Sequence, residues 1–502
     1  MSIDSNTPVL IGVAQLLQRA GDEGPALGPL DMLERVTRDA AEECGAGERA
    51  LAAIDSIGIG GVVGWSPQNA PRLLAERLGI EVQTEIVTHL GGEAPLTLVN
   101  EVADRILAGE VRVAMLAGAN ALDSLMAARK QNSWLDWAKG GEGEPEHIGS
   151  TKPGTDEREK LYGISAPVNI YPIIENALRA RRGLGIDEHQ AALGRMMGRF
   201  TEQAAANPYA WFPVARSGEE LVRTSDANRM IAFPYTKYLN AVLFTDQAAG
   251  VLIASKQAAD ELGVPESQRV YWWGGATTYE RGWFVSERED VSTAPGMQEC
   301  ARRTFANTGV GIEDIRHIDF YSCFPVAVEV ACEAYGVAED DPRGLTVTGG
   351  LPYAGGPGNN YTMHALIGVA LRCRANPGEK GLVTGNGWYL TKHSANIWST
   401  QPKPGDPPTG RWPEDLLAGP KPVEVIDQAE GPGRVEAYTV TYDRAGVPER
   451  GVVIGRLDAD NRRFIAHLPS ETALLASFTE HEGVGRRGCV SQARGQNLFS
   501  PE

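Results

Sequence analysis

The chain has 502 residues, of which 42% are hydrophobic and 22% are charged, and its formal net charge is −18. This length is too great for one hydrophobic core and predicts two or three domains. The acidic balance argues against a nucleic-acid partner, because phosphate backbones bind broad basic surfaces, although a local basic cluster could hold a small phosphorylated ligand.

The six cysteines are scattered and form no Cys-x-x-Cys pair, so the sequence predicts neither a zinc site nor a disulfide framework. Reduced thiols favour a cytoplasmic protein. The short apolar run Val9–Val13 has no basic leader and is typical of a first strand. No stretch approaches the roughly 18 apolar residues of a membrane span, and we expect a soluble protein.

Short apolar runs alternate with amphipathic stretches, the pattern of α/β layering. One helix begins after Gly91–Gly92, has Pro95 in its first turn and ends at Gly109. The predicted strands of the first 400 residues are Val9–Ala14, Ile54–Ile59, Glu85–Thr88, Val111–Ala117, Gly250–Ala254, His317–Tyr321 and Gly381–Thr384.

Two segments of the chain are similar to each other in sequence, which indicates a duplicated α/β unit. Residues 108–118 and 377–385 both run from a helix end with Gly-Glu into a buried strand that ends in glycine. We therefore predict two similar halves. The first consists of residues 1–121 and 239–255, and the second of residues 256–400.

The region 122–238 between these halves is predicted to be an inserted loop domain. It begins rich in glycine, proline and charge and continues as helices that carry many arginines. An insertion of this length is more often functional than decorative. The arginines are interpreted either as a solvated helix face or as phosphate contacts, and both interpretations stay open; they are Arg179, Arg181, Arg182, Arg195 and Arg199.

The composition of the sequence changes again after Trp398. Residues 401–422 are rich in proline and predict a stiff linker, because proline continues neither a helix nor a central strand. Residues 423–502 contain short alternating strands and one helix, typical of a small β-barrel of the oligonucleotide/oligosaccharide-binding type. The predicted elements are Val435–Tyr442, Gly451–Leu457, Phe464–Leu468, the helix Glu471–Glu480 and a strand near Cys489–Val490.

The duplicated halves, the insertion and several loops together resemble the thiolase superfamily over roughly residues 8–400. The similarity is greatest to the sterol-carrier-protein-like branch, and within it to thiolase-like proteins of type 1, which carry an added C-terminal domain. The resemblance implies a five-layered α-β-α-β-α fold. It also implies ligands that are acyl groups carried on coenzyme A, with coenzyme A as a substrate carrier and no other cofactor or metal.

Thiolases use a cysteine nucleophile at the N-terminus of a buried helix, where unpaired backbone N–H groups stabilise a thiolate and bind the oxyanion. The resemblance places that position on Gly92, and no cysteine lies in the segment Thr88–Pro95. The Gly-His-Pro loop becomes Gly355-Gly356-Pro357, so its histidine is replaced by Gly356. The Cys-x-Gly loop aligns near Gly385 and lacks its cysteine.

The remaining family loop reads Tyr321-Ser322-Cys323-Phe324 in this chain. The resemblance gives Tyr321 the place of the residue that positions the oxyanion-hole water, and gives Cys323 the place of the second acid/base thiol. Without a nucleophile, the covalent acyl-enzyme intermediate cannot form, so the reaction lacks a step and is not just slower. The resemblance therefore implies that the chain does not perform ordinary thiolase turnover.

Other side chains could rebuild a site. Cys323 is either a buried small hydrophobe or a catalytic thiol. His364 and His393 are either satisfied core histidines or groups that face the cavity, and Glu93 is either a helix-dipole partner or a general base. Phosphates of coenzyme A could contact three arginines of the insertion, namely Arg179, Arg181 and Arg182.

Three functional hypotheses follow. In the first, the chain is a pseudoenzyme that binds an acyl-coenzyme A or a related lipid thioester. In the second, it is an acyltransferase or hydrolase that uses substitute residues, so enzymatic activity stays open. In the third, the C-terminal barrel binds a protein partner and the core is a scaffold. We expect a monomer, with a dimer as the alternative.

Overall fold

The computed structural model describes residues 4–19, 22, 25–410 and 416–502. Its strands are β1 (Pro8–Gln18), β2 (Ser56–Ile59), β3 (Thr84–Thr88), β4 (Val113–Ala121), β5 (Glu146–Ile148), β6 (Met230–Ala232), β7 (Tyr235–Thr236), β8 (Asp246–Ser255), β9 (Val270–Glu280), β10 (Ile315–Asp319), β11 (Lys380–Gly387), β12 (Lys392–Ser399), β13 (Leu417–Ala418), β14 (Gly431–Tyr442), β15 (Pro448–Leu457), β16 (Arg463–His467), β17 (Arg487–Ala493) and β18 (Gln496–Pro501).

The helices are α1 (Pro29–Glu43), α2 (Glu48–Ala53), α3 (Ala70–Leu78), α4 (Ala94–Leu107), α5 (Leu122–Lys130), α6 (Glu157–Leu161), α7 (Pro167–Arg181), α8 (Ile186–Ala206), α9 (Gly218–Val222), α10 (Lys256–Glu261), α11 (Pro295–Thr308), α12 (Pro325–Tyr335), α13 (Tyr361–Ala375) and α14 (Thr472–Glu480). No described helix combines the length and the apolar character that crossing a membrane requires.

The two halves have the same strand arrangement, which confirms the duplication. In the first half β1, β8, β4 and β2 lie side by side, and in the second half β9, β12, β11 and β10 do so. The last pair of each set is parallel and the other pairs are antiparallel. The halves join where β1 pairs with β9, so that the described strands form one large mixed sheet.

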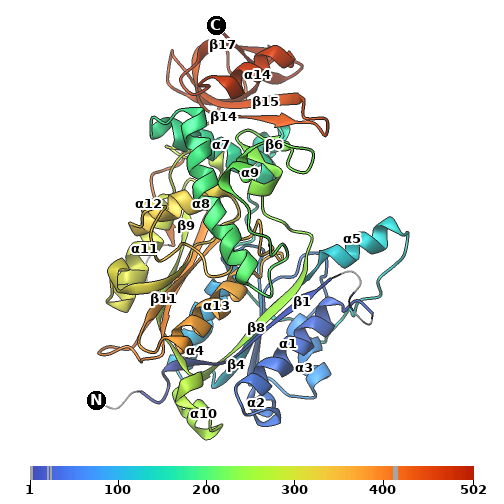
Figure 1. Cartoon of the computed structure of the whole chain (residues 1–502), viewed down its shortest axis with the longest axis vertical. Coiled ribbons are helices and arrows are strands. Elements are labelled where there is room, and N and C mark those ends of the chain that lie inside the picture. The colour runs from blue at the N-terminus through green and yellow to red at the C-terminus, as the bar shows by residue number, and fades with distance from the viewer. Residues whose placement is uncertain (1–3, 20–21, 23–24, 411–415) are drawn as a thin grey trace.

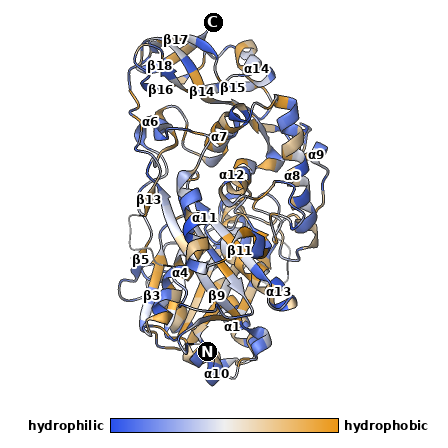
Figure 2. Cartoon of the chain, turned by 90° about the vertical axis from the view of Figure 1, so that its left-hand side faces the viewer, coloured by the Kyte–Doolittle hydropathy of each residue, from blue (hydrophilic) through white to orange (hydrophobic). Residues whose placement is uncertain are grey.

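Helices α4 and α13 form the middle layer between the two halves of this sheet (Figure 1). Helix α4 contacts β4 on one side and β9 and β12 on the other, and α13 contacts both β8 and β11. A helix in this position buries most of its surface, and the side chains of Leu96, Leu98 and Val102 are fully buried. Figure 2 shows the hydrophobic residues concentrated in these inner elements.

The outer layers complete the five-layered architecture. Helix α1 packs on β1, β8 and β4, and α11 packs on β9 and β12. The chain therefore has the mixed α/β thiolase-type fold that the sequence predicted. Its middle layer places the N-terminus of α4, with Gly92 just before it, inside the molecule.

The insertion covers one edge of the large sheet. Strand β5 of the insertion pairs in parallel with β3 through Ile86↔Glu146, Val87↔His147 and Thr88↔Ile148. An uncovered edge strand offers unpaired N–H and C=O groups to a second chain. In this chain the β3 edge already has a partner from within the molecule.

The C-terminal elements form the five-stranded barrel that the sequence predicted. The strands follow the order β14-β15-β16-β18-β17 and close because β14 pairs with both β15 and β17. Tyr438, Phe464, Phe478 and Phe499 fill its core. Figure 1 shows the barrel at one end of the molecule, beside α7.

The barrel makes backbone contacts with the insertion. Strand β6 of the insertion pairs with β14 through Ala232↔Thr441, and the N–H of Phe233 donates to the carbonyl of Val440. The linker prediction needs qualification. Residues 411–415 lie outside the described residues, whereas Leu417–Ala418 forms a short strand parallel to β9, so this segment partly belongs to the large sheet.

Candidate functional site

Two glycines precede α4 at the position where thiolases carry their nucleophile. The N–H of Gly91 donates to Asn359 Oδ1 at 2.9 Å, and Thr362 Oγ1 donates to the carbonyl of Gly92 at 3.2 Å. Asn359 lies two residues before α13, and Thr362 lies in its first turn. The sequence analysis missed both residues, although the Asn-Asn pair after the glycine-rich loop could have indicated a role in holding another loop.

The side chain of Tyr321 fills the space beside Gly92. A Cβ atom added at Gly92 would lie 2.1 Å from Tyr321 Oη and 2.6 Å from the carbonyl oxygen of Asn386. The backbone N–H of Tyr321 donates to Thr384 Oγ1 at 3.0 Å, and its ring packs edge-on against Tyr361 at 5.5 Å. Burial raises the pKa of Tyr321 well above its usual value, so this group is a neutral phenol.

Cys323 lies near this position but in an environment that favours the thiol. Its side chain is buried, and its nearest polar groups are Asn386 Nδ2, at 3.9 Å from Sγ, and the hydroxyl of Tyr171. Desolvation by burial raises the pKa of the Cys323 thiol to about 12. Reactive cysteines instead need a depressed pKa from a base or a cation, and the groups around Cys323 supply neither.

A buried ion pair lies at the N-terminal end of α4. Lys392 Nζ is 2.8 Å from Glu93 Oε1 and also donates to the carbonyl of Leu90 at 2.6 Å. The side chains of Lys392 and Glu93 are 0% and 3% exposed. A Cβ atom added at Gly387 would overlap Glu93 Oε2, so a glycine is required there to admit the carboxylate. This pair is a buried charged contact at the N-terminal end of α4.

The other two vacant family positions lie in close packing. A Cβ atom at Gly385 would be 2.7 Å from the Cα of Glu93, which leaves no room for the thiol of a Cys-x-Gly loop. Gly356 donates its N–H to the carbonyl of Val242 at 2.8 Å, and a Cβ atom there would lie 3.3 Å from Leu351. Gly385 and Gly356 are thus both closely packed, and the prediction that they stand where the family carries reactive side chains stays a prediction.

The structure does not bring the two histidines into one group with Cys323. His364 Nδ1 lies 2.7 Å from Gln15 Oε1 of β1, and burial lowers the pKa of His364 to about 3. His393 Nε2 lies 3.2 Å from Glu280 Oε1 of β9. Each imidazole thus has a partner outside the segment around Gly92, and a catalytic role for either stays a prediction.

The three arginines predicted to contact phosphates are engaged by carboxylates. Arg179 is buried and makes two 2.8 Å hydrogen bonds to Glu482 of the barrel. Arg181 pairs with Glu333 at 2.6 Å, and Arg182 pairs with Glu329, Glu333 and Glu339 at 2.7 to 2.9 Å. Phosphate contact by these residues stays a prediction, and it would require these pairs to open.

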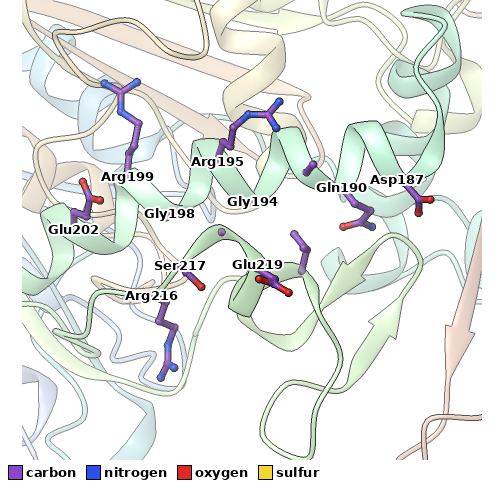
Figure 3. A pocket seen from close by; sticks show the side chains of 13 residues that line it. Asp187, Gln190, Gly194, Arg195, Gly198, Arg199, Glu202, Arg216, Ser217 and Glu219 are labelled. Atoms are coloured by element: carbon purple, nitrogen blue, oxygen red, sulfur yellow. The ribbon is translucent and has the colours of Figure 1, made fainter.

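A different part of the insertion offers an arginine-lined pocket. The space between α8 and α9 has a volume of about 530 Å³, and Arg195, Arg199 and Arg216 line it together with Gln190 and Ser217. Figure 3 shows the side chains of Arg195 and Arg199 on the same side of α8, one turn apart. Arg199 donates to the carbonyl of Asp341, and Arg216 pairs with Glu220 and lies over the ring of Tyr238.

The pocket also contains acidic groups, so it is not a uniformly basic surface. Asp187, Glu202 and Glu219 line it beside the three arginines. Local recognition of a single phosphate would therefore depend on individual guanidinium groups rather than on a broad field.

Comparisons with known proteins agree with this geometry. The family model for the thiolase-like protein type 1 additional C-terminal domain matches residues 413–494. A crystal structure of a monomeric SCP2-thiolase-like protein type 1 from Mycobacterium smegmatis is 31% identical and covers 99% of this chain and 100% of its own, with a TM-score of 0.82.

More distant proteins share the fold. The peroxisomal thiolase of Saccharomyces cerevisiae has a TM-score of 0.56 at 15% identity over 80% of this chain and 99% of its own. The benzoylsuccinyl-CoA thiolase subunit BbsB of Thauera aromatica is 26% identical over 141 residues, 28% of this chain and about a third (34%) of that protein's length. The full-length match at 31% identity is the decisive one: this chain belongs to the thiolase-like protein type 1 family.

Proposed function

We propose that this protein binds coenzyme A or an acyl-coenzyme A without performing thiolase chemistry. One observation carries the proposal: the hydroxyl of Tyr321 occupies the space beside Gly92, where the family's nucleophilic side chain would begin. Loss of the nucleophile removes the covalent intermediate. The filled space also prevents an acyl carbon from reaching the oxyanion-binding N–H groups at the start of α4.

The binding part of the proposal rests on the family and on the insertion. Thiolases bind acyl groups as coenzyme A thioesters, and three arginines are among the residues that line the pocket between α8 and α9, although their guanidinium groups extend to different sides of it (Figure 3). Arg195 is the best phosphate ligand of the three, because Arg199 and Arg216 already have protein partners. A guanidinium group binds phosphate through two parallel N–H donors.

The monomeric state is part of the same proposal. The relative from Mycobacterium smegmatis is described as monomeric, and in this chain β5 occupies the β3 edge. A second chain could not add to that edge without displacing β5. We propose that the protein is a monomer, which size-exclusion chromatography with light scattering would test.

Calorimetric titration of the intact protein with coenzyme A and with 3′-dephospho-coenzyme A tests the binding proposal. We expect heat of binding with coenzyme A. Arg195→Gln should weaken binding roughly tenfold or more, because a hydrogen bond to a charged group contributes about 1.5–3 kcal/mol. Arg35→Gln is the matched control, since Arg35 is an exposed arginine on α1 that pairs with Asp39.

The absence of heat with coenzyme A and acetyl-coenzyme A at high concentration would contradict the proposal and favour a scaffold. A parallel assay follows the release of free thiol from acyl-coenzyme A esters. Thiol release that disappears in Cys323→Ala would instead support an acyltransferase or hydrolase with substitute residues, and would overturn the non-catalytic part of the proposal.

A further inference from the structure

Three helices from two parts of the chain bring metal-ligating side chains together away from the Gly92 region. Glu175 lies on α7, His189 on α8 and Glu329 on α12. One ligand atom from each residue lies within 4.8 Å of the others, and the three residues are 0%, 1% and 1% exposed. Two helices of the insertion thus meet a helix of the second half at a buried His-Glu-Glu cluster.

The contacts of this cluster leave one carboxylate oxygen without a hydrogen-bond partner among the described residues. His189 Nε2 lies 2.6 Å from Glu175 Oε1, and the Tyr235 hydroxyl donates to the other oxygen, Oε2. Arg182 donates to Glu329 Oε1 at 2.7 Å. Among the described residues, Glu329 Oε2 is buried and has no hydrogen-bond donor, although it faces the carboxylate of Glu175.

The local charges do not balance. Arg181 and Arg182 pair with three carboxylates, namely Glu329, Glu333 and Glu339, whereas Glu175 has no arginine partner among the described residues. Two neighbouring carboxylates in a dry interior cannot both stay ionised unless a cation lies between them. A bound divalent cation, or a proton shared between the two carboxyl groups, would relieve the repulsion between Glu175 and Glu329.

We propose that Glu175, His189 and Glu329 form a structural binding site for a divalent first-row transition metal such as Zn²⁺ or Mn²⁺. An imidazole nitrogen with two carboxylates suits these ions, whereas Mg²⁺ and Ca²⁺ prefer oxygen ligands alone. The hydrogen bonds from Tyr235 and Arg182 to the outer carboxylate oxygens are those that orient metal-ligating carboxylates. His189 Nδ1 has no partner among the described residues, so the outer hydrogen bond that usually orients a ligating imidazole is not made by a described protein group.

The position of this site explains what the ion would stabilise. The Tyr235 hydroxyl, which donates to Glu175, also accepts a hydrogen bond from the N–H of Val326 in the first turn of α12. That turn follows the loop that carries Tyr321 and Cys323. A bound ion would therefore hold the insertion against the second half beside this loop. Since solvent does not reach the ligands, the ion is loaded during folding.

The test uses the full chain without a metal-binding tag, produced in medium supplemented with Co²⁺ or Zn²⁺ and purified without chelators. We expect roughly one metal ion per chain by elemental analysis. The Co²⁺ protein should show visible d–d absorption typical of mixed nitrogen and oxygen ligands. Glu329→Gln should lower the metal content at least roughly tenfold, because an amide is a poor substitute for a ligating carboxylate.

Two further variants keep the test decisive. The stacked pair His89 and His147 is the control, because His89→Ala/His147→Ala removes two partly exposed imidazoles and should leave metal content and the Co²⁺ spectrum unchanged. His189→Gln should abolish the bound metal and the Co²⁺ absorption. A circular dichroism spectrum like that of the wild type shows that this variant is folded.

The alternative is a proton shared between the two carboxyl groups, and the same variants separate it from a metal site. Metal-free protein with no Co²⁺ absorption, together with a Glu329→Gln variant at least as heat-stable as the wild type, would overturn the proposal. In that case the amide introduced by Glu329→Gln donates the hydrogen bond that a protonated Glu329 carboxyl group donates in the wild type. These measurements do not depend on coenzyme A binding.

Discussion

The hydroxyl of Tyr321 and the α-carbon of Gly92 are packed so closely that no side chain fits between them: a Cβ atom at position 92 would lie 2.1 Å from Tyr321 Oη. These residues are far apart in the sequence and come from different halves of the fold. Their contact turns the absence of a nucleophile into a filled site, because restoring a cysteine alone would create a clash.

Gly92→Cys should therefore destabilise the protein without restoring activity. We expect a loss of about 1–3 kcal/mol in the free energy of unfolding, the usual cost of overpacking a core. Urea denaturation measures the change. Gly60→Ala is the control, because a Cβ atom there meets nothing closer than 3.8 Å, and it should change stability by less than about 1 kcal/mol.

The double variant Gly92→Cys/Tyr321→Ala tests the contact itself. Removal of the Tyr321 ring relieves the overlap with its hydroxyl group but leaves the 2.6 Å approach to the carbonyl oxygen of Asn386, so the double variant should recover part of the loss and the two changes should be non-additive. Additive effects in the double-mutant cycle would show that the two residues do not compete for the same space.

The ion pair between Lys392 and Glu93 should behave as a buried pair. Lys392→Met leaves the Glu93 carboxylate without its cation and should cost about 3–5 kcal/mol in thermal or urea unfolding. Adding Glu93→Gln to this variant should recover part of the loss, because the uncompensated charge is then removed.

Lys256→Met provides the comparison for that pair. Lys256 pairs with Asp260 at 2.7 Å on the surface helix α10, and exposed pairs contribute at most about 1 kcal/mol. Equal losses in Lys256→Met and Lys392→Met would contradict the buried character of the Lys392 pair.

The cysteines should differ sharply in reactivity. All six fall within the described residues and are unpaired; only Cys489 is exposed. Burial raises the pKa values of Cys300, Cys323 and Cys373 to about 12. A thiol-specific disulfide reagent at pH 8 should therefore modify one thiol rapidly and the others only after unfolding.

Cys489→Ser identifies the fast thiol in that experiment. The variant should lose the rapid phase entirely. A rapid phase that persists in Cys489→Ser and disappears in Cys323→Ala would show an activated Cys323, and would favour the hypothesis of catalysis by substitute residues.

Glu159 should make stability depend on pH. Its carboxyl is fully buried, one oxygen accepts from the N–H of Ser286, and burial raises its pKa from 4.5 to about 7. Between these values the folded state binds more protons than the unfolded state. The stabilising contribution is therefore complete below pH 4.5 and is lost as the pH rises through 7.

The difference between wild type and Glu159→Gln isolates this contribution. The variant keeps a neutral side chain at every pH, so its stability relative to the wild type should rise by up to roughly 3 kcal/mol between pH 4.5 and 7. Glu157→Gln, at a surface glutamate of the same helix, should show no such trend. A pH-independent difference for Glu159→Gln would contradict the raised pKa.

The sequence by itself determined the class of fold, whereas the loss of thiolase chemistry that it predicts stays a prediction. Hydrophobic runs and glycine ends placed β2, β4, β10, β11 and α4 within a few residues of their observed bounds, because neighbouring residues set these patterns. The absence of a cysteine before α4 could be seen from the residues of that loop alone. The short strands β5 and β6 were not predicted from the sequence, because strands of three residues carry no periodicity.

The tertiary structure decided which residues meet. Only the fold shows that the Tyr321 hydroxyl contacts Gly92, that β5 pairs with the edge strand β3 and that Glu482 accepts hydrogen bonds from Arg179. The arginines looked alike as residue types in one helical stretch, yet some point to carboxylates and others to a pocket. Such contacts join segments hundreds of residues apart. Their partners depend on the packing of whole layers, which local sequence patterns do not encode.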